Sequence, residues 1–306
     1  MIELRQLTKR YGEAAVVDGL TFDVRPGVVT GFLGPNGAGK SSTMRMILGL
    51  DRPTSGSATI GGRRYAGLPV PLREVGALLD AHAVHPRRTA FDHLLSLAYA
   101  NGIGRRRVEE VLGLVGLADV AGRRPGGFSL GMKQRLGIAV ALLGDPPVAL
   151  LDEPVNGLDP EGIRWIRTLT RSLAAEGRTV LVSSHLMSEM ALTADHLVVI
   201  GRGRLIADIG LEAFVHSAAP QAVLVRTPDA PRLASLLWDA GAAVRPGAGD
   251  GLTVTGMSSA EIGGIAGAHG IVLHELTPWR ASLEEAYLEL TGDCVEFTAS
   301  PAGVAS

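Results

Sequence analysis

The sequence has little cysteine, few aromatic residues and no long apolar run, and these shortages exclude several classes of protein. A single cysteine among 306 residues, Cys294, excludes an internal disulfide and fits a reducing compartment. No apolar run approaches the roughly 18 to 20 residues that a membrane-spanning helix needs. The opening stretch MIELRQLTKRYG lacks a basic segment followed by an apolar core, so we expect no signal peptide.

Positive and negative charges are nearly balanced, and lysine is scarce. The formal net charge of -2 gives no general attraction to nucleic acid or to an anionic bilayer, so we expect no nucleic-acid partner. Lysine occurs only at Lys9, Lys40 and Lys133, and nearly all other positive charge is carried by arginine. Because an ammonium group and a guanidinium group differ in shape and hydration, each lysine marks a position of interest.

The texture of the chain changes near residue 210, which predicts two domains of different kinds. Residues 1–210 alternate helical patterns with short apolar runs typical of strands buried on both faces, and about 85–145 is predicted to be a helical subdomain. Residues 211–295 read as strand, helix, strand, helix, strand and a final helix, which predicts a small α+β domain. We expect the small, polar tail at 296–306 to be disordered.

The most informative stretch is VVTGFLGPNGAGKSS, where a strand ends at Leu33 and a glycine-rich loop leads into a helix. This spacing is that of a phosphate loop, so the first domain is predicted to be an α/β P-loop NTPase. The glycines let consecutive N–H groups surround phosphate oxygens, and the helix N-terminus adds partial positive charge. Lys40 is expected to bridge the β- and γ-phosphates, Ser41 to hold Mg²⁺ and Ser42 to reach the α-phosphate. The predicted nucleotide-binding residues of the loop are Gly34, Pro35, Asn36, Gly37, Ala38, Gly39, Lys40, Ser41 and Ser42.

Two adjacent carboxylates end the buried strand in PPVALLDEP. Asp152 suits a partner of Mg²⁺, and Glu153 is placed to polarise a water molecule for attack on the γ-phosphate. Asp159, in NGLDP, is predicted to cap the following helix, a role compatible with one in catalysis. His185 follows the buried strand in TVLVSS, where it either contacts the γ-phosphate or has a structural role.

A further stretch, GGFSLGMKQRLGIAVALLGD, has a glycine-flanked entrance that a helix made only for packing does not need. Together with the phosphate loop, LLDEP, GLD and SSH, the segment SLGMKQR resembles the ATP-binding subunit of ABC transporters over residues 1 to about 210. The resemblance implies an ATPase with ATP and Mg²⁺ as cofactors, and a head-to-tail homodimer with two ATP molecules between its subunits. It also implies that Ser129 and Gly131 bind the γ-phosphate of the ATP held by the partner, in trans.

Some positions depart from the family pattern. Leu130 and Met132 replace a glycine and the glutamine of the family's Leu-Ser-Gly-Gly-Gln. Asp80, in GALLDAHAVHP, stands where the family usually has glutamine, and the resemblance implies that its carboxylate contacts Mg²⁺. Tyr11 matches the aromatic residue that stacks on adenine, and because stacking discriminates poorly among bases, GTP stays an alternative to ATP.

With one ATPase domain and an α+β appendage, the chain resembles the separate ATPase subunit of ABC-2-type exporters of the daunorubicin-resistance kind. The resemblance implies a separately encoded transmembrane permease, a location in the cytoplasm on the inner face of the membrane, and drug, antibiotic or lipid-like cargo. The alternative is a soluble ABC ATPase that acts on a partner such as the ribosome. For residues 211–295 we expect dimer stabilisation or regulation, with binding of a regulatory small molecule as the alternative.

Overall fold

The structure is a computed structural model that describes residues 1–217, 222–247, 251–279, 283 and 287. Its contacts divide the chain into a first unit that contains Met1–Gly210 and a second unit that begins at Leu211. The predicted disordered tail at 296–306 and most of the final helix predicted before it lie outside the described residues.

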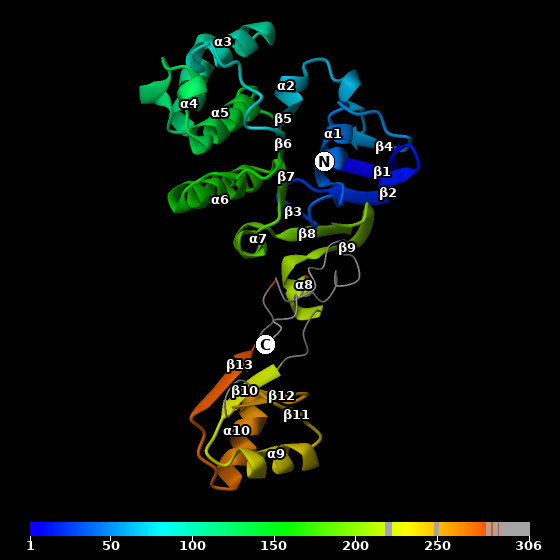
Figure 1. Cartoon of the computed structure of the whole chain (residues 1–306), viewed down its shortest axis with the longest axis vertical. Coiled ribbons are helices and arrows are strands. Elements are labelled where there is room, and N and C mark those ends of the chain that lie inside the picture. Colours follow the sequence, from blue (N-terminus) through cyan, green and yellow to red (C-terminus); the bar gives the residue numbers. More distant parts are fainter. Residues whose placement is uncertain (218–221, 248–250, 280–282, 284–286, 288–306) are drawn as a thin grey trace, which may run out of the picture. The chain divides into compact units, whose positions relative to one another are not determined.

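A sheet of six strands, in the order β5-β6-β7-β3-β8-β9, forms the centre of the first unit (Figure 1). Every neighbouring pair is parallel except β8 and β9, which form the antiparallel hairpin that HLVVIGRGRLIADI predicts. All residues of β3, β6 and β7 are buried, as expected for strands covered on both faces. The strands are β3 (Val29–Leu33), β5 (Val75–Leu78), β6 (Val148–Leu151), β7 (Thr179–Ser184), β8 (His196–Gly201) and β9 (Arg204–Gly210).

A second, antiparallel sheet packs against the first through a shared apolar core that includes residues of α1 (Lys40–Ile47). The rings of Phe22 and Phe32, one from each sheet, lie 5.6 Å apart between centroids. The sequence predicts short strands at IELRQL and LTFDVR, but these segments belong to one long hairpin of β1 and β2, and the sequence does not predict β4. The strands are β1 (Ile2–Tyr11), β2 (Ala14–Val24) and β4 (Ser55–Ile60).

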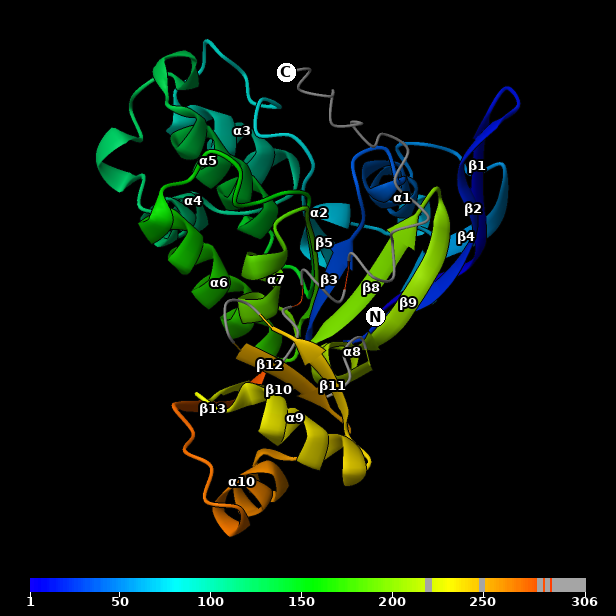
Figure 2. The same cartoon turned by 60° about the horizontal axis from the view of Figure 1, so that its bottom comes forward.

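Three helices gather in the segment predicted as a helical subdomain, and both views show them together (Figures 1 and 2). They are α3 (Ala90–Ala100), α4 (Arg105–Leu114) and α5 (Leu130–Leu142). Ser129 caps α5 by accepting a hydrogen bond from the Met132 N–H at 3.2 Å. Arg107 ties α4 to α5 by donating to the Leu142 carbonyl at 2.8 Å. The remaining helices of the unit are α2 (Pro71–Glu74), α6 (Pro160–Ala175) and α7 (Met187–Thr193), with 3₁₀ turns at Tyr65–Gly67, Ala118–Val120 and Pro125–Gly127.

The second unit has a four-stranded antiparallel sheet in the order β11-β12-β10-β13, with its helices between the strands of a βαββαβ sequence. Its core joins one face of the sheet to both long helices, through residues such as Val225, Leu237, Val254 and Ile262. The elements are α8 (Leu211–Ser217), β10 (Ala222–Arg226), α9 (Ala230–Asp239), β11 (Ala243–Pro246), β12 (Gly251–Thr255), α10 (Ser259–Ala268) and β13 (Glu275–Trp279).

Two details of this unit differ from the sequence prediction. The sequence does not predict the short strand β11. It predicts a strand over IVLHEL, residues 271–276, whereas β13 begins only at Glu275. The reason for the second difference is the pairing partner, because β10 ends at Arg226, directly opposite Glu275. Within the part of the chain that the structure describes, no helix has the length and apolar character needed to cross a membrane.

Candidate active site

The glycine-rich loop joins β3 to α1 and requires glycine at positions where the backbone approaches other segments. A Cβ atom at Gly34 would lie 2.6 Å from the Ile200 carbonyl oxygen, and one at Gly39 would lie 2.6 Å from that of Val16. Gly39 also has a φ of 103°, in the left-handed region that disfavours side chains. The loop therefore folds tightly against the hairpin strands and leaves its N–H groups at the start of α1.

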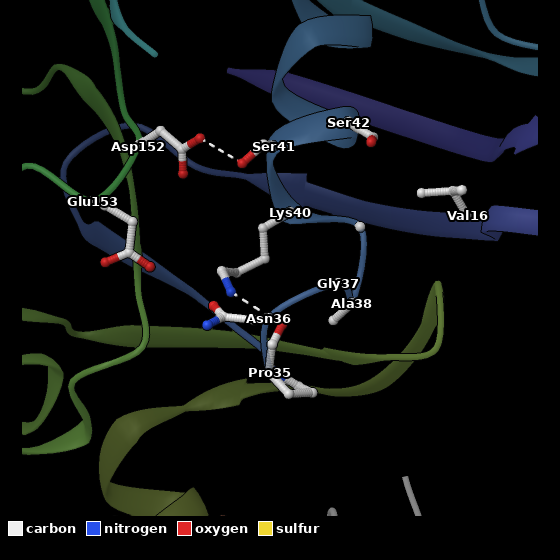
Figure 3. A pocket seen from close by; sticks show the side chains of 11 residues that line it. Val16, Pro35, Asn36, Gly37, Ala38, Lys40, Ser41, Ser42, Asp152 and Glu153 are labelled. Carbon is white, nitrogen blue, oxygen red and sulfur yellow. Dashed lines mark hydrogen bonds between the residues drawn. The ribbon is translucent and has the colours of Figure 1, made fainter. Parts of the chain in front are cut away.

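The loop borders a cavity of about 250 Å³ (Figure 3). The cavity is lined by residues 35–42 together with Val16, Asp152 and Glu153. Loop and carboxylates meet here because β6, β7 and β3 are neighbours in the sheet, and their carboxyl ends lie at the same edge.

Lys40 is buried, and its ammonium group is held by the loop itself. Its Nζ donates to the Gly34 carbonyl at 2.6 Å and to the Pro35 carbonyl at 3.3 Å. Burial lowers the pKa of Lys40, while the negative charges of Glu153 and Asp152 act in the opposite direction. A buried cation beside a cradle of N–H groups suits a polyphosphate anion, so the residues present fit the phosphates of a nucleotide.

Asp152 connects the loop to the neighbouring strand β7. Its Oδ2 accepts from the Ser41 hydroxyl at 2.7 Å, as Figure 3 shows, and its Oδ1 accepts from the Ser183 hydroxyl. A hydroxyl and a carboxylate oxygen at this distance are suitable oxygen ligands for Mg²⁺. Ser183 was not among the predicted site residues, although it belongs to SSH, one of the segments that carry the resemblance to the family.

Glu153 and His185 form a hydrogen-bonded pair. Oε2 of Glu153 lies 2.8 Å from Nδ1 of His185, and the side chain of Glu153 is 20% exposed against 46% for His185. The backbone of Glu153 has a φ of 47°, which is uncommon for a residue with a side chain. Glu153 borders the cavity, and the hydrogen bond with the His185 ring fixes the orientation of its carboxylate. A general base needs such a fixed orientation.

Other predicted site residues lie away from this lining within one chain. Ser129 caps α5, and Asp159 caps α6 by accepting from the Gly162 N–H at 2.8 Å.

Tyr11 is 53% exposed at the end of β1, with Lys9 Nζ 4.9 Å from its ring centroid. Asp80 is exposed, and its Oδ1 accepts from the His82 N–H at 2.7 Å.

Comparison with known proteins shows the family. A family profile described as "ABC transporter" matches residues 17–156, and another, described as a domain of unknown function, matches residues 221–284. The bacitracin transport ATP-binding protein BcrA of Bacillus licheniformis is 44% identical over 212 residues, which cover 68% of this chain and 69% of that protein. The lantibiotic transport ATP-binding protein SrtF of Streptococcus pyogenes is 36% identical over 208 residues, covering 68% of this chain and 90% of SrtF.

A solved structure of an ATP-binding cassette supports the same family. The dimeric post-hydrolysis state of the ATP-binding cassette MJ0796, bound to ADP and Pi, superposes with a TM-score of 0.63 at 26% identity, covering 69% of this chain and 99% of that one. These matches confirm the predicted fold class, the ATPase activity, and ATP with Mg²⁺ as cofactors. The chain therefore belongs to the ABC transporter family, as an ATP-binding and ATP-hydrolysing subunit.

Proposed function

We propose that two copies of this chain bind two ATP molecules head to tail and drive export through a separately encoded membrane permease. The observation that carries the proposal is the convergence of Lys40, Ser41, Asp152 and Glu153 on one cavity at the carboxyl edge of the sheet. The transport relatives support the permease and the dimeric cassette supports the homodimer. The chain then lies on the cytoplasmic face of the membrane, where its permease holds it.

The residues divide the work within one site. Lys40 and the N–H groups of the loop bind the β- and γ-phosphates, and Ser41 and Asp152 hold the Mg²⁺ that neutralises phosphate charge. Glu153 takes the proton of the attacking water, and His185 orients that carboxylate and reaches towards the γ-phosphate. Asp159 holds the start of α6 in place through its cap.

The partner completes the site. Ser129 is exposed at the start of α5, and its oxygen accepts the capping hydrogen bond, which leaves the hydroxyl proton free to donate to an anion. The Gly131 amide and the helix dipole add to this anion-binding end. Ser129 and Gly131 thus bind the γ-phosphate of the ATP that the other copy holds, while the exposed Tyr11 ring stacks on adenine.

The cargo and the second unit are part of the same proposal. Because relatives are named for bacitracin and lantibiotic transport, we propose a peptide antibiotic or a similar amphiphilic compound as cargo. Residues 211–295 serve dimer stabilisation or regulation of the ATPase unit. Purification of the chain from membranes tests the proposal, because a membrane protein with about six spans should co-purify. Co-sedimentation with ribosomes, and with no membrane protein, would contradict the proposal.

Asp80 provides a testable prediction on Mg²⁺. Its carboxylate is exposed and bound to the backbone of its own loop, so we propose that it contacts the ion through water. Asp80→Ala should raise the Mg²⁺ concentration for half-maximal hydrolysis about tenfold, as the loss of an outer partner does at metal sites. A titration with Mg²⁺ at saturating ATP measures this, and unchanged Mg²⁺ dependence and turnover would show that the assignment is wrong.

A further inference from the structure

The segment that leaves β6 lies on one face of α5. Gln134 is 4% exposed, and its Nε2 donates to the Glu153 carbonyl at 3.0 Å. Leu130 lies one turn earlier on the same face, against Gly157: a Cβ atom there would be 2.4 Å from both Cγ and Cδ2 of Leu130. We call these four residues, Leu130, Gln134, Glu153 and Gly157, the α5 clasp.

The clasp holds Glu153, the one residue other than glycine in the cavity lining that has a positive φ. Glu153 has a φ of 47°, and such a conformation persists only where the surroundings fix it. Its N–H donates to the Ser183 hydroxyl at 2.9 Å, and its carboxylate meets His185 at 2.8 Å. Its carbonyl accepts from Gln134 and from the Asn156 N–H at 3.2 Å. Gln134 is the one side chain in this set that comes from α5.

The same helix begins at the residues that face the partner. Ser129 is the cap of α5, and Leu130 and Gln134 lie within its first two turns. A displacement of the start of α5 is therefore carried to the Glu153 carbonyl through Gln134, and to Gly157 through Leu130. Leu130, a departure from the family pattern, adds a contact that a glycine at this position would lack.

From these contacts we infer that Gln134 is a positioning residue that sets the carboxylate of Glu153 according to the state of α5. Since α5 also carries the residues for the partner's ATP, the clasp links the two nucleotide sites of the dimer. The inference rests on the proposed function, in which Glu153 is the base and Ser129 acts in trans. A packing role alone would be met by methionine, which is similar to glutamine in length and volume.

The test is the Gln134→Met variant, with hydrolysis measured per bound nucleotide. We expect kcat to fall about tenfold or more, because small misplacements of a catalytic group are costly, while ATP affinity and ATP-driven dimer formation change less than twofold. In a Glu153→Gln background, Gln134→Met should cause no further loss. Thr170→Val is the matched control, since Thr170 is buried and its hydroxyl donates only within α6, to the Ile166 and Arg167 carbonyls.

The outcomes separate the inference from the proposed function. A Gln134→Met protein with kcat within twofold of the unsubstituted chain would overturn the inference, as would an equal loss in the Thr170→Val control. An additional loss in the Glu153→Gln background would show that Gln134 acts other than through Glu153, and would also overturn it. If Glu153→Gln alone kept normal turnover, the base assignment itself would fail, independently of the result for Gln134.

Discussion

A Glu153→Gln protein should bind ATP and dimerise stably, yet hydrolyse ATP about 10²- to 10⁴-fold more slowly than the unsubstituted chain. The amide has the shape of the carboxylate and can keep a hydrogen bond to His185, which now lies 2.8 Å from Oε2. It has no basic oxygen to take the proton of the attacking water. The substitution therefore removes the chemical step and leaves the nucleotide cradle intact.

Single-turnover hydrolysis and analytical ultracentrifugation with Mg²⁺ and ATP measure these two effects separately. Glu161→Gln, which changes an exposed glutamate in the first turn of α6, is the control for loss of one negative charge. Near-normal turnover of Glu153→Gln would contradict the assignment of the base. Failure of the variant to bind ATP would place Glu153 in nucleotide binding and not in the chemical step.

The second large effect is expected at the phosphate loop. Lys40→Ala should weaken ATP binding roughly tenfold to a hundredfold, the range for losing a hydrogen bond to a charged group. Its Nζ donates to two loop carbonyls, and none of the other residues that line the cavity is basic, so no cation in this lining can replace it. Equilibrium binding of a fluorescent ATP analogue measures the change. The melting temperature without nucleotide shows whether the fold is intact, and unchanged affinity in a folded variant would contradict the assignment.

Much of the fold and of the nucleotide site could be predicted from the sequence because the signals are local. The phosphate loop combines a strand end, glycines and a helix start within fifteen letters, and each has its own conformational requirement. The buried strands β6 and β7 are continuous apolar runs that end in polar side chains. Since parallel strands present their carboxyl ends at one edge, Lys40 and Asp152 could be placed together from the sequence.

The features that could not be predicted depend on which segments meet in space. β11 contains Arg245 and Pro246 and is an edge strand, so its apolar signal is weak. The start of β13 is set by the end of β10, and the apolar run before it gives no sign of this limit. The hydrogen bond from Gln134 to the Glu153 carbonyl joins α5 to the segment that follows β6. No spacing of residues in the sequence indicates this contact.

The central claim is that each ATP site is built from two copies of the chain, with the loop of one facing the start of α5 of the other. Because Cys294 is the single cysteine, a Cys294→Ser chain accepts one new thiol at a chosen position. Asn36→Cys places it on the cavity lining, and Met132→Cys places it in the first turn of α5. Both carry Glu153→Gln, so that bound ATP is not consumed.

Covalent dimer formation with a short bis-thiol reagent, with and without Mg²⁺ and ATP, is the measurement. A head-to-tail dimer predicts an ATP-dependent cross-link when the two proteins are mixed, and little cross-link in either protein alone. A cross-link that forms equally well in one protein by itself, or that ignores ATP in the mixture, would contradict the shared site.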